Sequence, residues 1–502
     1  MVKYNLRIID AIIILVYLFL AASISYIVSR RQKNKKDFIL AGKKMHWFPV
    51  AISGVAAGFS AISMMGVPGF VMAYDMRYLP SLFTGILSIP VVFYFLIPFL
   101  YKLNIVSVYE YLEIRFSPKI RIFASALFIL TKIGYLSMVI LTPSIALSAV
   151  TGINLNLLIA IFGLITTIYT VAGGMEGVIW TELLQYFVIV GGVVALILFF
   201  IFSSVAGNVS EYWSVASEAG KTKMLDFSFD LKSLSIWALI LNTTLMGVAA
   251  MCNDQTSIQR FFTAKSVKDA MKGYLFSIIF GTPIVLALYF IGAWMYGFFH
   301  SSHVLPAELT NKYDMVFPFF VAKYLPVGVA GIVLAGIFAA GMSTISDVQH
   351  SLTSLFMVDF YERFTSKSEK GKHYVKVSRF VSFFWGAMAI VGAFYVMNLG
   401  NSIIEVTGVL AGFLAAPLGG IYFLGILTKK ANNIGVIIGG ISGIVANVGA
   451  FLLNKHGIVE INFNWYAVFG ITTTFTVGYL TSLIFSSATK ISSLQACVME
   501  SK

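Results

Sequence analysis

The sequence predicts an all-α membrane protein with about thirteen transmembrane helices. The chain has 502 residues, of which 58% are hydrophobic and only 11% are charged, whereas soluble domains carry about 25% charged residues. Its mean hydropathy is +0.87. Apolar runs long enough to cross a bilayer recur from one end of the chain to the other, which is typical of a polytopic membrane protein.

Short polar loops separate the apolar segments, and a segment of about 20 apolar residues suffices for one helical crossing. We expect transmembrane helices near residues 8–29, 47–73, 79–101, 121–149, 155–174, 179–203, 234–252, 272–298, 328–357, 378–398, 403–427, 434–454 and 465–487. The first segment lacks a small-residue cleavage pattern, so we expect a retained helix rather than a signal peptide.

The net charge of +13 is concentrated in a few short loops. The basic loops are "RRQKNKK", "KLNIVSVYEYLEIRFSPKIR", "QRFFTAKSVKDAMKG", "YERFTSKSEKGKHYVKVSR" and "LTKKANN". Placing all five in the cytoplasm, as the positive-inside rule requires, predicts an outside N-terminus and a cytoplasmic C-terminus in a plasma membrane. The longer loops at 204–233 and 299–327 then lie outside. This explanation of the charge removes the reason to expect a nucleic-acid partner.

Several function classes are excluded by what the chain does not contain. The longest non-apolar stretch is about 30 residues, which leaves no room for an appended kinase or nucleotidase domain. There is no "GxxxxGK[ST]" loop, so ATP-driven pumping is not expected. The two cysteines, Cys252 and Cys497, show no metal-ligand spacing.

Two of the apolar segments are expected to be interrupted. The segment 47–73 contains "SGVAAGFSAISMMGVPG", where glycines and a proline disfavour continuous helix, and 234–252 contains "LNTTLMG". The two segments lie about 190 residues apart, and each opens a run of five helices. Weak segments at matching places in two halves indicate an inverted-repeat transporter, although glycine also serves helix packing in membranes.

A polar cluster occupies the middle of the predicted helix 328–357. The stretch "AAGMSTISDVQH" places Ser343, Thr344, Ser346 and Asp347 within one apolar segment. Buried polar groups at membrane depth need partners. The cluster therefore either pairs with another helix or binds a ligand, while His350, one turn further on, is expected to be a packing residue.

Five motifs between residues 47 and 433 occur in an order typical of one transporter family. They are "GFSAISMMGVPG" at 58–69, "SVYEYLEIRF" at 107–116, "TVAGGMEGVIWTELLQ" at 170–185, "DQTSIQRFFTAKS" at 254–266 and "GILTKKANN" at 425–433. By these motifs the chain resembles the sodium:solute symporter family, and in particular its bacterial sugar and sialic-acid members.

The resemblance implies a leucine-transporter-type fold with two inverted repeats of five helices. The implied divisions of the single domain 1–502 are an extra helix at 8–29, repeats at 47–203 and 234–427, flanking helices at 434–487 and a cytoplasmic tail at 488–502. It also implies sodium-driven import of a small polar organic solute across the bacterial inner membrane, without an organic cofactor. A monomer would suffice, because the site lies within one chain.

The family's shared sodium site carries over to five residues of this chain. Backbone carbonyls would come from Ala56 and Phe59 at the break in the first core helix, and oxygens of Ala340, Ser343 and Thr344 from the eighth. The last three have i, i+3, i+4 spacing and therefore share one helical face. The alternative is that both hydroxyls only hydrogen-bond their own helix.

A second cation site is implied by relatives that hold another sodium with an acid of the fifth core helix. Here that place is taken by Glu182, and the eighth helix offers Ser343, Ser346 and Asp347. Two carboxylates where relatives have one require either a cation or a bound proton. We expect a second sodium, with a proton as the competing occupant; Glu182 could instead be an exposed acid.

The solute is expected at mid-membrane beside the break in the first core helix. The candidate residues are Ser60, Ser63, Tyr78, Lys132, Tyr135 and Gly247. Sialic-acid members have an Arg where this chain has Tyr135, and sugar members have an Asn at Gly247 and a Gln at Ser63. Neither specificity therefore transfers, although Lys132, a mid-helix lysine that needs a partner, could hold an anionic solute.

Three other functions stay open from the sequence. The chain could be a symporter for a monocarboxylate-like or vitamin-like anion with a proton as second coupling ion. It could be a transporter-like sensor, although such chains usually carry an appended domain. A membrane-embedded enzyme would need converging ligands inside the helices, whereas the six histidines lie mostly at helix ends and in loops.

Overall fold

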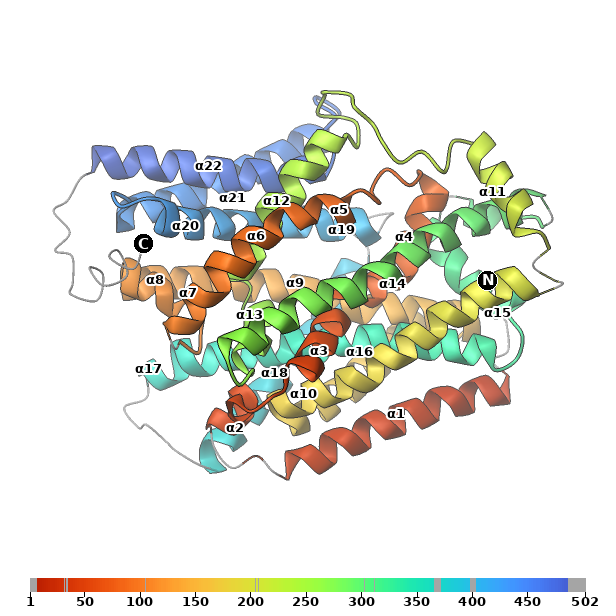
Figure 1. The fold of residues 1–502 in the computed structure, drawn as a ribbon, viewed down its shortest axis with the longest axis horizontal. Helices are drawn as coiled ribbons and strands as arrows, with labels where there is room; N and C mark the ends of the chain where they lie inside the picture. Colours follow the sequence, from red (N-terminus) through yellow and green to blue (C-terminus); the bar gives the residue numbers. More distant parts are fainter. Residues whose placement is uncertain are drawn as a thin grey trace.

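The structure is a computed structural model that describes residues 7–30, 32, 35–103, 105–203, 205, 207–301, 303–310, 312–364, 372–397 and 403–485. Within these ranges the chain is helical, and the only strand-like pairing there is an isolated bridge between Met45 and Ala264. Most of the long helices run roughly side by side along the longest axis of the molecule (Figure 1).

The helices, in chain order, are α1 (Ile8–Ser29), α2 (Lys35–Leu40), η1 (Ala41–Lys43), α3 (Trp47–Gly58), α4 (Ala61–Ala73), α5 (Ser81–Thr84), η2 (Gly85–Ser88), α6 (Ile89–Val91), η3 (Val92–Leu96), α7 (Ile97–Lys102), α8 (Glu110–Arg115), α9 (Pro118–Thr151), α10 (Leu155–Phe202), α11 (Val209–Glu218), α12 (Ile236–Asn253), α13 (Gln255–Phe262), α14 (Val267–Ser301), η4 (Ala307–Leu309), η5 (Tyr313–Met315), α15 (Val316–Tyr324), α16 (Val329–Phe356), η6 (Met357–Tyr361), α17 (Glu362–Phe364), α18 (Lys372–Val396), α19 (Ile403–Leu410), η7 (Ala411–Ala415), α20 (Ala416–Leu427), α21 (Asn433–Lys455) and α22 (Asn464–Ile484).

The described residues contain eleven helical spans long and apolar enough to cross a membrane, and one further span made of the bent pair α3 and α4. The chain is thus a multi-pass membrane protein. Helix α10 has 48 residues, about 72 Å if straight, against a hydrocarbon core of about 30 Å. Gly174, with φ 53° and ψ −171°, breaks it. The expected number of thirteen stays a prediction that requires the two arms of α10 to cross separately.

The break predicted in the segment 47–73 is present. Helix α3 ends at Gly58 and α4 begins at Ala61, with a bend of 50° between them. Phe59 and Ser60 between the two helices are extended, with ψ of 95° and 166°. The last carbonyls of α3 therefore have no partner four residues further along the same helix.

The prediction that the helix is interrupted within 234–252 is wrong. Helix α12 runs unbroken from Ile236 to Asn253, and the chain leaves the helix only at Asp254, where α13 starts. The hydroxyl of Thr243 donates to the Leu239 carbonyl in the same helix. Gly247 packs against Ser88, so the helix retains this glycine for a close contact rather than for a bend.

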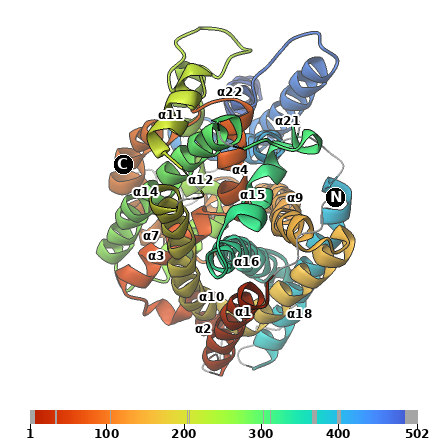
Figure 2. The same cartoon turned by 90° about the vertical axis from the view of Figure 1, so that its right-hand side faces the viewer.

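Helix α16, which carries the polar cluster, lies at the centre of the bundle (Figure 2). It belongs to the most buried of these spans, in which 89% of an apolar stretch of 18 residues is buried inside the protein. It packs against α1, α9, α10 and α18. Small residues allow this: a Cβ at Gly341 would lie 2.7 Å from Pro143 of α9. Asp10 of α1 accepts the N–H groups of Gly328 and Gly331 over 2.8 and 2.9 Å, which caps the start of α16.

The connecting helices gather at two opposite ends of the bundle. Helices α2, α8 and α17 lie at one end in Figure 1, and α11 and α15 lie at the other. The first group borders the basic segments of the sequence. At that end the buried carboxylate of Asp359 accepts hydrogen bonds from Arg121, Ser107 and Ser125, so one ion pair joins α9 to the end of α16.

Candidate sodium and solute sites

Oxygen atoms from α3 and α16 meet at the bend between α3 and α4. The Ser343 hydroxyl lies 2.9 Å from the Ala56 carbonyl oxygen and 3.0 Å from that of Ala340. The Thr344 hydroxyl lies 3.1 Å from the same Ala340 oxygen. Four of the five predicted sodium ligands therefore lie together, in a buried position.

Phe59, the fifth predicted ligand, is also buried, and it stands where the backbone leaves the helix. Its N–H donates to the Val55 carbonyl as the last helical bond of α3, while its own carbonyl leaves the helix with the extended backbone. Backbone carbonyls and hydroxyls are the neutral oxygen ligands that hard cations accept. The arrangement fits a sodium ion. Both hydroxyls also donate hydrogen bonds to the Ala340 carbonyl of their own helix, which is the alternative that the sequence left open.

A cluster of three charged side chains lies between α10, α13 and α16, one turn further along α16 than Ser343. The guanidinium of Arg260 pairs with the Asp347 carboxylate and lies 3.7 Å from a Glu182 oxygen. Ser53 donates its hydroxyl to Glu182 and accepts from Arg260 over 3.1 Å. All of these groups are buried, Glu182 completely, so the reading of Glu182 as an exposed acid is wrong.

Ser346 does not join this cluster through a donated bond. Its hydroxyl donates to the carbonyls of Met342 and Ser343 in its own helix, over 2.9 Å each. Its role as a cation ligand stays a prediction. His350 is buried, with its ring 5.2 Å from that of Phe38, in agreement with a packing role.

Arg260 is not among the predicted site residues, because the sequence predicts a cytoplasmic loop for the motif that contains it. In the structure this stretch is α13, and Gln255, Gln259 and Arg260 are all buried. A signal was available: two carboxylates at membrane depth require a cation, and Arg260 stands seven residues after the end of α12.

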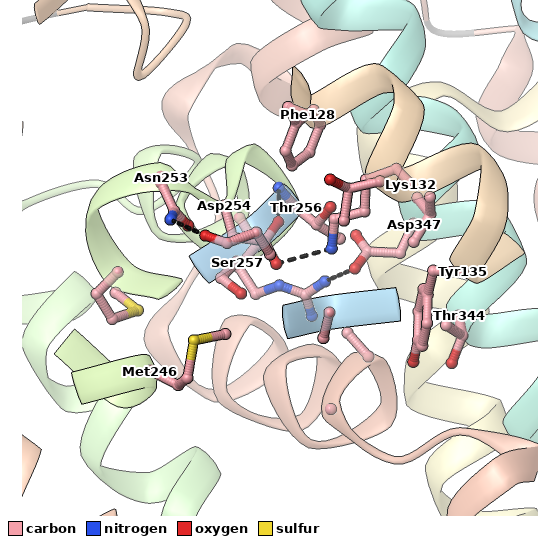
Figure 3. A pocket seen from close by; sticks show the side chains of 18 of the residues that line it. Phe128, Lys132, Tyr135, Met246, Asn253, Asp254, Thr256, Ser257, Thr344 and Asp347 are labelled. Atoms are coloured by element: carbon pink, nitrogen blue, oxygen red, sulfur yellow. Dashed lines mark hydrogen bonds and ion pairs between the residues drawn. The ribbon is translucent and has the colours of Figure 1, made fainter. Parts of the chain in front are cut away.

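A cavity of about 430 Å³ lies beside this cluster. Helices α3, α9, α12, α13, α14, α16 and α19 contribute to its wall, which carries four charged side chains: Lys132, Asp254, Arg260 and Asp347. The Lys132 ammonium lies 2.7 Å from the Asp254 carboxylate. Figure 3 shows this pair and the neighbouring Asp347 carboxylate pointing into the same space, with Tyr135 and Thr344 at one side.

Two of the predicted solute residues, Lys132 and Tyr135, line this cavity, whereas Ser60, Ser63, Tyr78 and Gly247 do not. Ser60 is buried at the bend, and Gly247 faces Ser88. All six stay predictions as solute-binding residues. The partner of Lys132 is Asp254, so the lysine is held inside the protein and does not extend to the membrane surface.

Tyr78 belongs to an aromatic plug on the side of the bend where α4 lies. Its ring is 5.9 Å from that of Phe70 and 5.7 Å from that of Phe463, and Ile404 packs on the same cluster. A second cavity of about 750 Å³ is lined by Phe463 of this plug, by Tyr74 and by residues of α19, α21 and α22. Leu410 lines both cavities.

Comparison with known proteins shows the family to which the chain belongs. Residues 38–443 match the Sodium:solute symporter family. Over 474 residues the chain is 29% identical to the sodium/sialic acid symporter NanT of Aliivibrio fischeri, covering 94% of this chain and 92% of that one. It is 28% identical to the human sodium-coupled monocarboxylate transporter 1 over 416 residues, covering 82% of this chain and 67% of the other.

Solved structures share the fold. A Na⁺-coupled sialic acid symporter, solved in a substrate-bound outward-open state, superposes with a TM-score of 0.86 at 28% identity, covering 97% of this chain and 99% of the other. Mhp1, a nucleobase-cation-symport-1 family transporter in a closed conformation, superposes with a TM-score of 0.58 at 13% identity, covering 92% and 98%. At that identity the second likeness concerns the fold alone.

Proposed function

The chain belongs to the sodium:solute symporter family, and on this premise we propose that it imports a small polar organic solute together with sodium by alternating access. It is a transporter and not an enzyme. The observation that carries the proposal is the cradle of oxygens from Ala56, Ala340, Ser343 and Thr344, which joins the bend of the first core helix to α16. A sodium ion held there would bridge two helices that must change their relative position during transport.

The charges around the cavity support a second coupling cation. Two cations, Lys132 and Arg260, lie among the described residues of this region, with three carboxylates: Asp254, Asp347 and Glu182. One negative charge is in excess, and an uncompensated charge at this depth is unfavourable. One Glu182 oxygen is buried without a hydrogen-bond partner. We place the second sodium, or a proton, beside it.

For the orientation in the membrane and for the two repeats, we propose what the sequence predicts. With the basic segments in the cytoplasm, the end of the bundle at α2, α8 and α17 faces inward, while α11 and α15 face outward. The N-terminus then lies outside and the C-terminus inside. The repeats would be 47–203 and 234–427, so the sodium cradle joins the first helix of one repeat to a helix of the other.

Sodium entry supplies the free energy for accumulation. Each charge that moves inward across about 100 mV contributes about 2.3 kcal/mol before its concentration gradient is counted. Two cations per solute would support steep accumulation. The cavity of about 430 Å³ is within the usual size of small-ligand sites. The relatives named above are described as carriers of sialic acid or monocarboxylates, which places this solute among small polar organic compounds.

Uptake into proteoliposomes tests the proposal. We expect labelled solute to accumulate under an inward sodium gradient with a negative interior, and a sodium ionophore to abolish the accumulation. The panel contains sugars, polyols, sialic acids, monocarboxylates and vitamins. If no solute moves with sodium, although a panel member stabilises the protein against heat, the chain is a sensor and not a carrier.

A further inference from the structure

The charged side chains that face the cavity are already paired with one another. Lys132 lies 2.7 Å from Asp254, and Arg260 is paired with Asp347. These four are the charged residues of the cavity wall within the described part of the chain. The Lys132 and Asp254 side chains are largely but not fully buried, with 13% and 22% exposed, so a bound molecule can reach them.

We propose, on the basis of the symport proposed above, that the solute is an uncharged polyhydroxylated molecule of the sugar or polyol class. It is held by the Lys132–Asp254 pair acting as a combined hydrogen-bond donor and acceptor. This narrows the solute from the broad class of small polar compounds and names the two residues that select it.

The hydrogen-bonding capacity of the pair fits hydroxyl groups. An ammonium group has three N–H donors, and one of those of Lys132 is used by Asp254. The other Asp254 oxygen accepts the Thr256 N–H over 2.9 Å, and each carboxylate oxygen retains a further lone pair. A hydroxyl can accept from the ammonium and donate to the carboxylate at once. The rings of Phe128 and Tyr135, 5.4 and 5.5 Å from the ammonium, provide apolar faces for the carbons of the solute.

A carboxylate solute fits this wall poorly. A carboxylate bound to the remaining N–H donors of Lys132 would share the ammonium with Asp254, which leaves one negative charge beside the cavity uncompensated. Arg260 offers no alternative, because it is already shared between Asp347 and Glu182. The same reasoning excludes a simple cationic solute, which would have to take Asp254 or Asp347 from its partner.

A change of charge without a change of shape tests the assignment. Asp254→Asn keeps a side chain that caps the start of α13, since Asn and Asp are equally good caps, but leaves Lys132 unpaired. Lys132→Gln removes the cation instead. Asp230→Asn is the matched control, because Asp230 also caps backbone N–H groups, in a loop outside the cavity. Uptake of a neutral sugar panel and of a sialic-acid and monocarboxylate panel is measured for all four proteins.

We expect the unmodified protein and Asp230→Asn to transport a neutral polyhydroxylated solute. Uptake of the neutral solute falls at least about tenfold in both cavity variants. Only Asp254→Asn gains uptake of carboxylates. Sodium-driven uptake confined to carboxylates in the unmodified protein would overturn the inference and leave the proposed symport intact. Neutral uptake unaffected by either cavity variant would overturn the role of the pair. Absence of any sodium-driven uptake would instead overturn the symport itself.

Discussion

Ser343 of α16 donates its hydroxyl to the backbone carbonyl of Ala56 at the end of α3, over 2.9 Å and across 287 residues of sequence. The contact joins α16, which belongs to the most buried span among the described residues, to the bent pair of α3 and α4. A cation that takes this hydroxyl and this carbonyl as ligands would favour the arrangement in which the two helices are close. Release of the cation would weaken that arrangement, which is the coupling that a symporter requires.

Glu182→Gln should remove one coupling cation while the protein stays folded. The change cancels the excess negative charge around Arg260, and the amide oxygen can still accept from Ser53. We expect one cation fewer per solute, measured as the ratio of radioactive sodium to solute entering proteoliposomes. Glu211→Gln, on the exposed side of α11, is the control.

The same variant distinguishes sodium from a proton as the second ion. If a proton occupies the site, uptake by the unmodified protein depends on external pH and the sodium ratio does not change in Glu182→Gln. A Glu182→Gln protein with unaltered sodium ratio and unaltered pH dependence would contradict a second site at this carboxylate.

Tyr78→Ala should make the bend between α3 and α4 more accessible to reagents in solution. The substitution removes a ring that contacts both Phe70 and Phe463, so the plug loses its central member. We expect a cysteine placed at Ser63, in a chain with Cys252 and Cys497 replaced by Ser, to react several-fold faster with an impermeant thiol reagent. Tyr395→Ala, with a ring 75% exposed on α18, should leave the rate unchanged. Equal rates in all three proteins would show that the plug is not the barrier.

Arg121→Met should destabilise the end of the bundle at α8 and α17. It leaves the fully buried Asp359 carboxylate without its cation, and loss of one partner of a buried pair costs about 3–5 kcal/mol. A large fall in the unfolding temperature in detergent is expected, with partial recovery when Asp359→Asn is added. Lys119→Met, exposed on the same helix, should have little effect. If adding Asp359→Asn did not raise the unfolding temperature of Arg121→Met, the broken ion pair would not be the cause of the lost stability.

The low pKa of Asp226, in the loop between α11 and α12, predicts that the stability of the protein depends on pH in the acid range. Hydrogen bonds from the hydroxyl and N–H of Ser228, and then from Arg77, lower the pKa of Asp226 to about 2, from about 3.9 in an unfolded chain. A lowered pKa stabilises the folded protein above pH 4, and this contribution is lost as the pH falls from about 4 to about 2. The unfolding temperature of the unmodified protein should therefore fall more steeply over that interval than that of Asp226→Asn; parallel curves would refute the assignment.

The sequence alone predicted the elements whose causes are local. Glycines and a proline in 47–73 predicted the bend between α3 and α4, and long apolar runs predicted the spans. The small and polar residues of 339–350 marked α16 as a helix surrounded by protein. The interruption in 234–252 was wrong because one glycine in a helix indicates either a bend or a close contact, and only the neighbour, Ser88, decides between them.

The pairings at the site could not be predicted, because they join distant parts of the chain. Lys132 was expected to need a partner, but nothing local identifies Asp254, 122 residues away. Arg260 meets Asp347 across 87 residues, and it was assigned to a loop because basic residues usually mark cytoplasmic loops. The sodium ligands were proposed through family resemblance, and it is the folded chain that brings Ala56 beside Ser343.

The most direct test of the oxygen cradle is equilibrium binding of radioactive sodium to purified protein. The double variant Ser343→Ala, Thr344→Ala removes two ligand hydroxyls, and Ser351→Ala removes a hydroxyl of the same helix that donates only to the Asp347 carbonyl. We expect half-maximal sodium binding to require at least about tenfold more sodium in the double variant, since lost ligands of a bound ion weaken binding by such factors, and to be unchanged in Ser351→Ala. Equal sodium affinity in the double variant and the unmodified protein would contradict the account.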